Sequence, residues 1–162
     1  MALIELSRGM VAIVDDADYD WLMDGPKWSC DAKNYAVRHV YDSTGRRVME
    51  KMHRLIAGAA PLQKVDHEDT DTLNNRRSNL RLATVKLNGA NRKKQPKYAG
   101  KPTKSKFKGV WFDPKRKRWR ATIRVNSKLK QLGRFPSEIE AAQAYDKAAV
   151  EAWAEFARPN WR

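Results

Sequence analysis

The sequence contains one cysteine, Cys30, so the chain cannot form an intramolecular disulfide. It has no run of about 18 apolar residues, which a membrane-spanning helix needs. It also has no charged start followed by an apolar stretch, as a secretory signal would have. These absences exclude a membrane-spanning helix and an intramolecular disulfide, and they make a reducing cytoplasm the default. We therefore expect a cytoplasmic protein that is not secreted and has no membrane partner.

Acidic residues are nearly missing from residues 86–135. This block holds 18 lysines and arginines but a single acid, Asp113, whereas the formal charge of the whole chain of 162 residues is +14. Clustered cations favour a polyanionic partner, because binding releases the counterions condensed on it. The block also contains Trp111, Phe112 and Trp119 and lacks an amphipathic helical period, so nucleic acid is favoured over an anionic membrane. A basic linker without a partner is the alternative.

Residues 1–51 predict a small β-rich scaffold. The chain is 41% hydrophobic and 32% charged, which is typical of a globular protein with one ordinary domain or two small ones. Alternating hydrophobicity predicts strands at 3–6 and 10–16 and a hairpin that turns at 43–45. A helical turn capped by Asp16 is expected between the strands and the hairpin.

A strand, a loop, a second strand and a helix are predicted in the middle of the chain. The strands are "KVDH" (64–67) and "NLRLAT" (79–84), and Thr84 can cap a helix that runs to about Lys94. Residues 95–104 are rich in lysine, proline and glycine and have no hydrophobic period. They predict a basic linker that becomes ordered on a polyanion.

The C-terminal residues 105–162 predict a small sheet packed on one helix, which makes the fold class α+β. In "RWRATIRV" (118–125), cationic and apolar positions alternate, so one face of a strand presents hydrogen-bond donors while the other packs. The following helix opens with a capping box made by Ser137 and Glu140. An apolar helical stripe is expected to cover the sheet: Ala141, Tyr145, Ala148 and Ala152.

An aspartate and a histidine stand together at Asp66 and His67, and several asparagines follow. A metal-dependent phosphodiesterase needs oxygen ligands for a hard cation, a base for water, and a group that holds this base in the correct tautomer. Neighbouring residues of a strand point to opposite faces, so the first strand must end near this pair if both are to act together. Asn88, one helical turn beyond Thr84, could meet a cation held by Asp66. Taken alone, an Asp-His pair is more often a turn.

The segment "MHRLIAG…VDHEDTDTLNNRRSNLRLATVKLN", residues 52–91, resembles the HNH homing endonucleases of phages and group I introns, in which a hairpin and a helix grip one divalent cation. The resemblance implies that His67 is the general base and that Asn79 orients it. It also implies that Asp66 and Asn88 hold Mg²⁺, for which Mn²⁺ can substitute. Asn88 stands where the family's name-giving pattern has a second histidine, and no structural zinc is expected.

The other polar residues of this segment have plainer interpretations. Asn74 and Asn75 are interpreted as loop residues, since asparagine tolerates left-handed backbone and bonds its own chain. His53 recurs in the family and is assigned a structural hydrogen bond or a phosphate contact. Asn91 lies almost one turn past Asn88 and is a further candidate for contact with phosphate.

Residues 105–161 resemble the DNA-binding domain of plant ethylene-response (apetala-type) factors, which also occurs fused to HNH nucleases. The "AAQAYDKAA" helix and the "ARPNW" tail carry the resemblance, which implies that a three-stranded sheet lies in the DNA major groove. The DNA-binding candidates are Lys108, Trp111, Thr122, Arg124, Gln131 and Arg134 by resemblance, Arg118 and Arg120 by strand alternation, and Arg92, Lys93 and Lys94 as contacts to the DNA backbone. Because Trp111 and Asp113 replace arginines of the plant factors, the plant target sequence is not carried over.

Together these patterns predict a metal-dependent, site-specific DNA endonuclease of the homing type that hydrolyses phosphodiester bonds. Its expected segments are the scaffold (1–51), a ββα-metal nuclease motif (52–94), the linker (95–104) and the DNA-binding domain (105–162). We expect a monomer that nicks double-stranded DNA in the cytoplasm, the host's if the chain is phage-encoded, with no small-molecule substrate. The alternatives are a catalytically inactive, sequence-specific DNA-binding regulator and a basic RNA-associated structural protein. The second is disfavoured because the major groove of A-form RNA is too narrow for a sheet.

Overall fold

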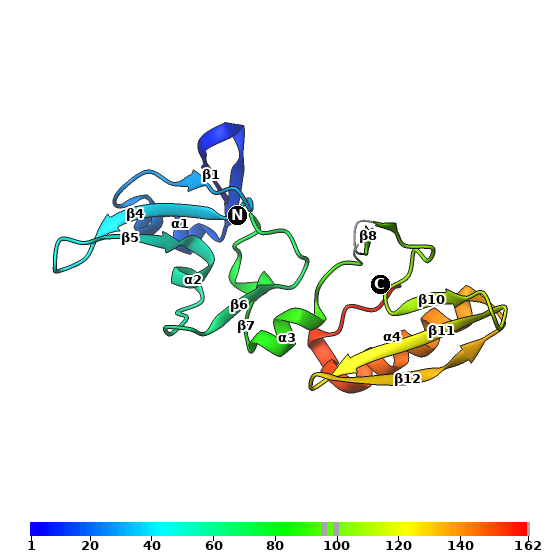
Figure 1. Cartoon of the computed structure of the whole chain (residues 1–162). Coiled ribbons are helices and arrows are strands. Elements are labelled where there is room, and N and C mark those ends of the chain that lie inside the picture. Colours follow the sequence, from blue (N-terminus) through cyan, green and yellow to red (C-terminus); the bar gives the residue numbers. More distant parts are fainter. Residues whose placement is uncertain (95–96, 99–100, 162) are drawn as a thin grey trace. The chain divides into compact units, whose positions relative to one another are not determined.

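The computed structural model describes residues 1–94, 97–98 and 101–161 (Figure 1). The chain is an α+β protein with two compact units, Met1–Thr84 and Val85–Arg162. As the sequence predicts, the N-terminal part consists of small sheets and short helices, and the C-terminal part contains a three-stranded antiparallel sheet packed on a helix. Within the described ranges, no helix is long and apolar enough to cross a membrane.

The first unit is built from small antiparallel sheets that pair β1 with β2, β3 and β5 with β4, and β6 with β7. Its elements are β1 (Ala2–Glu5), η1 (Ser7–Gly9), β2 (Val11–Val14), α1 (Asp16–Met23), β3 (Ser29–Cys30), β4 (Ala36–Tyr41), β5 (Arg47–Lys51), α2 (Met52–Ile56), β6 (Lys64–His67), η2 (Arg77–Asn79) and β7 (Leu80–Ala83). Asp15, and not Asp16, is the N-cap residue of α1. The predicted hairpin is present, and the Asp42 carboxylate closes its turn by accepting from the backbone N–H groups of Thr44 and Arg46.

One hydrophobic core joins the N-terminal strands to the segment that contains the Asp-His pair. Leu22 and Met52 are fully buried in this core, and Leu73 of the later loop packs into the same cluster. Trp28 also lies there and donates its indole N–H to the carbonyl of Leu22 at 2.9 Å. Burial of a large apolar side chain stabilises a fold by about 1.5 to 3 kcal/mol. The segment after β5 therefore depends on the first strands for its core.

Backbone pairing also holds the loop between β6 and β7 against the scaffold. Ile13 of β2 donates its N–H to the carbonyl of Leu73 at 2.9 Å and accepts from the N–H of Asn75 at 2.7 Å. Arg77, at the start of η2, donates its backbone N–H to Asp15 at 2.9 Å. Its guanidinium donates to the buried carboxylate of Asp18 at 2.6 and 2.9 Å. Residues 73–77 are thus tied to both β2 and α1.

In the second unit, one face of the sheet is covered by α4, and Figure 1 shows the helix lying along the strands. The elements of this unit are α3 (Val85–Ala90), β8 (Lys97–Tyr98), β9 (Lys101–Pro102), β10 (Val110–Asp113), β11 (Arg118–Val125), β12 (Lys128–Phe135), α4 (Glu138–Trp153) and η3 (Ala154–Phe156). Ala121 and Ile123 of β11 are buried in the clusters that α4 completes. Gly109 precedes β10 with a φ of +75°, and a Cβ there would lie 2.0 Å from the Tyr145 ring of α4, so glycine is required.

The capping of α4 is as predicted, but its buried stripe differs. The Ser137 side chain accepts from the backbone N–H of Glu140 at 3.1 Å and so caps the helix. The helix buries Ala142 and Ala149, whereas Ala152, which the sequence placed in the stripe, is exposed. The sheet therefore contacts a face of the helix that is rotated from the predicted one.

The segment before the sheet also differs from its prediction. Helix α3 ends at Ala90, about one turn before the expected end at Lys94. The carbonyl of Ala90 accepts a hydrogen bond from the Lys108 side chain at 2.6 Å, so a side chain satisfies one of the carbonyls at the helix end. The predicted linker, 95–104, lies partly outside the described residues. In the described part, β8 pairs with β9 as an antiparallel ladder.

Candidate functional site

Asp66 and His67 lie at the C-terminal end of β6. The strand ends at His67, as a joint role of the pair requires, and both side chains are buried. Arg81 of β7 lies directly opposite Asp66, and its Nη2 donates to Oδ2 of the carboxylate at 2.6 Å. Because Arg81 is only 13% exposed, this ion pair is shielded from water. The register of the two strands places Arg81 beside Asp66, a contact that the sequence does not predict.

The amide of Asn75 fixes the tautomer of His67. Asn75 is completely buried, and its Nδ2 donates to the carbonyl of Leu73 at 3.0 Å, which turns Oδ1 toward the imidazole. This Oδ1 lies 3.3 Å from Nε2 of His67, and an amide oxygen can only accept, so Nε2 carries the hydrogen. The lone pair of the neutral ring is therefore on Nδ1, the nitrogen that can accept a proton.

The surroundings of His67 keep its ring neutral. Burial lowers the pKa of His67, and the hydrogen bond to Asn75 opposes this shift only in part. The ring of His53 lies edge-on to it with centroids 5.1 Å apart, and Tyr35 lies 5.0 Å from His53. Burial also lowers the pKa of His53, to about 3. Nδ1 of His53 is buried and makes no hydrogen bond to any part of the chain that the structure describes.

Asn79 organises the loop that follows His67. Its Oδ1 accepts from the backbone N–H of Asp69 at 3.0 Å, and its Nδ2 donates to the Asp69 carboxylate and to the carbonyl of Asn74. The resemblance assigns the orientation of His67 to Asn79, and the side chain that contacts the ring nitrogen in the structure is that of Asn75. From the sequence Asn75 is interpreted as a loop residue, and no sequence signal separates it from its neighbour Asn74.

The remaining candidates of the nuclease segment lie on or after α3, in the second unit. Asn88 is half-buried on α3, and Asn91 is buried just beyond its end. The meeting of Asn88 with Asp66 stays a prediction. Among the residues that the structure describes, no group of three or more His, Cys, Asp or Glu side chains is arranged to hold a metal ion. Asp66 and Asn88 would supply only two oxygen ligands. Such a pair suits a hard cation whose coordination shell is completed by water and phosphate oxygens.

The face of the C-terminal sheet opposite α4 carries the predicted cationic row. Trp111 of β10 lies opposite Arg120 of β11, and the guanidinium stacks over the indole at 4.3 Å from its centroid. Arg118 and Arg124 are exposed on the same side of β11, since they alternate with the buried residues. Other members of this face are Thr122 on β11 and Gln131 and Arg134 on β12, whose register places them opposite Thr122 and Arg120.

Asp113 modifies this cationic face. Its carboxylate is largely buried and lies 3.7 Å from a guanidinium nitrogen of Arg116 and 4.0 Å from one of Arg134. A carboxylate at this position holds two arginines near the edge of the sheet. It also repels phosphate, so the charge pattern here differs from an unbroken row of cations.

Lys108 lies on the side of the sheet that carries α4. Its Nζ donates to the carbonyl of Ala90 and lies 6.0 Å from the centroid of the Tyr145 ring. Burial, followed by the charge of Arg158, lowers the pKa of Lys108 to about 8. Lys108 therefore does not share the open face with Trp111 and Arg120, although the resemblance groups it with them. It lines a pocket that also includes the predicted backbone contacts Arg92, Lys93 and Lys94.

Comparison with known proteins confirms both resemblances. Residues 105–155 match the AP2 domain family, which implies DNA binding by this part of the chain. An uncharacterised HNH endonuclease of Acanthamoeba polyphaga mimivirus is 35% identical to the chain over 136 residues, which are 83% of this chain and 66% of the relative. The chain thus spans just under two thirds of the length of that relative. No solved structure matches the chain significantly.

Proposed function

We propose that this chain is a metal-dependent DNA endonuclease in which His67 is the general base and the AP2 domain selects the DNA site. The observation that carries the proposal is the buried pair at the end of β6, where Asn75 holds the His67 ring with Nδ1 as the accepting nitrogen. Burial of polar side chains costs free energy, so a solvated turn is not expected to bury an aspartate, a histidine and an asparagine together. The homology to a viral HNH endonuclease supports the same conclusion.

The chemistry assigned to these residues is hydrolysis of a phosphodiester. His67 accepts a proton from the attacking water through Nδ1, the water oxygen bonds to phosphorus, and the bond from phosphorus to the leaving sugar oxygen breaks. Asp66 and Asn88 would hold one Mg²⁺, with Mn²⁺ as a substitute. A bound cation of this kind neutralises charge on the phosphate and on the leaving oxygen. Asn79 acts at a distance from the ring, by fixing the loop from which Asn75 projects.

The proposed DNA interface is the open face of the sheet, and homing is the proposed biological role. Arg120 and Arg124 are the residues proposed to read bases, because they project from the strand at the centre of the sheet. An arginine that is bidentate to guanine discriminates against other bases by about 1 to 3 kcal/mol. The proposed substrate is double-stranded DNA, and with one such site in each chain a monomer would nick one strand.

The test is conversion of supercoiled plasmids that carry a randomised insert, at low salt, with Mg²⁺, with Mn²⁺ or with EDTA. Wild type should convert them to the nicked form only with a divalent cation. His67→Ala should bind the plasmids equally well but cut about 10² to 10⁴ times more slowly. His39→Ala, which changes an exposed histidine on β4, is the matched control and should cut like wild type. Equal cutting by wild type and His67→Ala would remove the assignment of the base.

A catalytically inactive DNA-binding regulator is the second candidate, and the ion pair of Asp66 favours it. Arg81 donates to Oδ2 of Asp66 at 2.6 Å in a largely buried environment, so a cation must share this carboxylate with a guanidinium. If the pair persists on DNA, the metal is held weakly. Plasmid binding without conversion in Mg²⁺ and in Mn²⁺, for wild type and for Arg81→Gln, would support the regulator. Conversion that increases in Arg81→Gln would instead indicate a nuclease restrained by this pair.

A further inference from the structure

A pocket that is rich in cations lies within the second unit, away from the open face of the sheet. It has a volume of about 520 Å³. The residues that line it, called here the basic pocket, are Arg92, Lys93, Lys94, Lys106, Phe107, Lys108, Arg158, Pro159 and Asn160. They come from three separate segments: the residues after α3, the residues before β10, and the tail after η3. Six of the nine are lysine or arginine and none is acidic.

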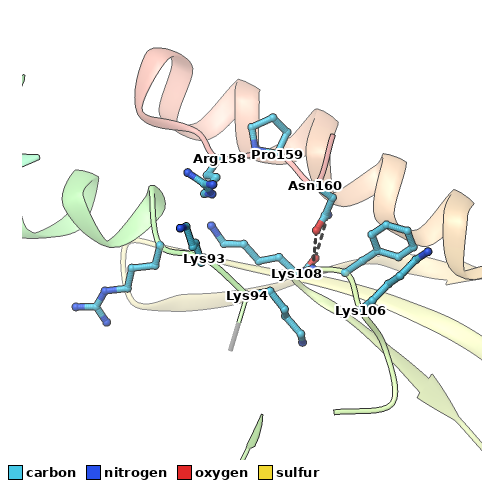
Figure 2. Close-up of a pocket in the computed structure, with 9 residues that line it drawn as sticks. Lys93, Lys94, Lys106, Lys108, Arg158, Pro159 and Asn160 are labelled. Carbon is cyan, nitrogen blue, oxygen red and sulfur yellow. Dashed lines mark hydrogen bonds between the residues drawn. The ribbon is translucent and has the colours of Figure 1, made fainter. Parts of the chain in front are cut away.

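Some of the cationic ends in the basic pocket gather in one part of it. In Figure 2 the side-chain ends of Lys93, Lys108 and Arg158 gather in one part of the pocket, whereas Lys106 points away from them. Besides burial, the charge of Arg158 lowers the pKa of the Lys108 amine, and the Asp146 carboxylate opposes this effect in part. Like charges held together destabilise a fold unless an anion offsets them. Their arrangement therefore suits an anion that contacts several donors at once.

The wall of the basic pocket is fixed by hydrogen bonds and does not depend on the cations alone. Asn160 accepts from the backbone N–H of Lys108 at 2.6 Å (Figure 2). Its side-chain amide donates to the Asp146 carboxylate at 2.8 Å. The backbone N–H of Asn160 also donates to Asp146. The tail is thus bound to the start of the sheet and to α4. The carbonyl of Ala90 is occupied by Lys108, so it is not directed at an incoming anion.

We propose that the basic pocket binds phosphate groups of the DNA backbone, at a position separate from the bases read by the sheet. The shape supports phosphate, because the pocket is open, wide and lined by donors from several directions, whereas base recognition would need an ordered row on one surface. The pocket borders the start of β10, which is an edge strand of the sheet. When a duplex is bound to the sheet, the phosphates that lie beyond the β10 edge are within reach of the basic pocket.

This inference rests on DNA as the partner, but not on cleavage. Arg92, Lys93 and Lys94 are predicted to follow the backbone by charge alone. The structure adds Arg158 and Lys106, which are more than ten residues away along the chain from these three, and it brings all of them to one pocket. The basic pocket would also connect the end of α3 to the DNA, because Lys108 bonds the last carbonyl of that helix.

The test measures the salt dependence of binding by the full chain to a random-sequence duplex, in EDTA so that no cutting occurs. The pocket variant is Lys93→Gln with Arg158→Gln. The control is Lys27→Gln with Lys147→Gln, which removes the same charge from exposed positions outside the basic pocket. Each phosphate contact contributes about 0.9 to the slope of log K against log salt. The pocket variant should lose about 1 to 2 units of slope, and the control should keep the wild-type slope.

Further arms separate the possible failures. Lys93→Gln alone changes an exposed side chain, so it tests the basic pocket even if the double variant unfolds, and it should lose about one unit of slope. Equal slopes for the pocket and control variants would overturn the proposal while leaving DNA binding intact. No binding by wild type would instead contradict DNA as the partner. A last arm measures thermal stability in inorganic phosphate at constant ionic strength. If phosphate stabilises wild type but not the pocket variant, and both bind DNA with the same slope of log K against log salt, the pocket binds free phosphate. That result would overturn its role on DNA.

Discussion

Replacing Asn75 by alanine tests how the His67 ring is held. The substitution removes the acceptor that lies 3.3 Å from Nε2 of His67 and leaves a buried N–H without that partner. An unsatisfied buried donor costs about 1 to 3 kcal/mol, which the ring can relieve by rotating or by moving its hydrogen to Nδ1. Either change removes the accepting lone pair from its position. Since about 1.4 kcal/mol corresponds to a factor of ten in rate, kcat should fall about 5- to 150-fold.

The assay compares single-turnover plasmid cutting by Asn75→Ala and by Asn74→Ala. Asn74 is an equivalent control because it is also buried and its amide makes two side-chain hydrogen bonds, one to Asp69 and one from Arg76, with none to the ring. Both variants should lose similar stability in urea unfolding, but only Asn75→Ala should lose kcat. Binding of DNA should be unchanged, because the side chain of Asn75 is completely buried.

A double-mutant cycle with His67→Ala gives the decisive result. If Asn75 acts only through the ring, its removal from the His67→Ala protein should slow cutting no further. A full additional loss in that background would refute the positioning role, and so would equal losses of kcat in Asn74→Ala and Asn75→Ala.

Gly109→Ala should destabilise the second unit by about 3 kcal/mol or more, measured by urea unfolding, because its Cβ would overlap the ring of Tyr145 and require a strained φ. Arg77→Ala should cost about 2 kcal/mol, since it removes two hydrogen bonds to the buried carboxylate of Asp18. Arg77 holds the pKa of Asp18 below its ordinary value, so its contribution is present at pH 7 and should shrink as the pH falls below about 4 toward the lowered pKa. A difference from wild type that does not shrink in acid would contradict this origin. Arg120→Gln should relax the base preference in selection from randomised duplexes by about 1 to 3 kcal/mol at one position, whereas an unchanged consensus would show that Arg120 contacts only phosphate.

The sequence predicts the elements of the site better than its contacts. Asp66 and His67 at the end of a strand follow from local alternation and from the resemblance, and the structure places them there. The choice between Asn75 and Asn79 as the neighbour of the ring does not follow from spacing. It depends on the pairing of the loop with Ile13, more than fifty residues earlier, which rotates Asn75 inward. Interactions between residues so distant along the chain leave no local pattern.

The same distinction applies to the helix of the second unit. A period of 3.6 residues predicts that α4 is amphipathic, and the cap at Ser137 is local enough to be read from two residues. Which alanines meet the sheet depends on the angle at which the helix crosses it. The structure buries Ala149 and exposes Ala152, which are less than one helical turn apart. Because alanine occupies several faces of this helix, the sequence does not show which alanines are buried.

The attachment of residues 73–77 to β2 and α1 has a consequence for anyone who wishes to transplant the site. The Asp-His pair, its hairpin and its loop look like a self-contained cassette that begins at Met52. Yet the backbone of the loop is hydrogen-bonded to Ile13, and Arg77 forms an ion pair with Asp18. Leu73 also packs in the same core as Leu22. A graft that begins at Met52 would carry the reactive residues without the parts that orient them. The smallest portable piece must start at the first strand.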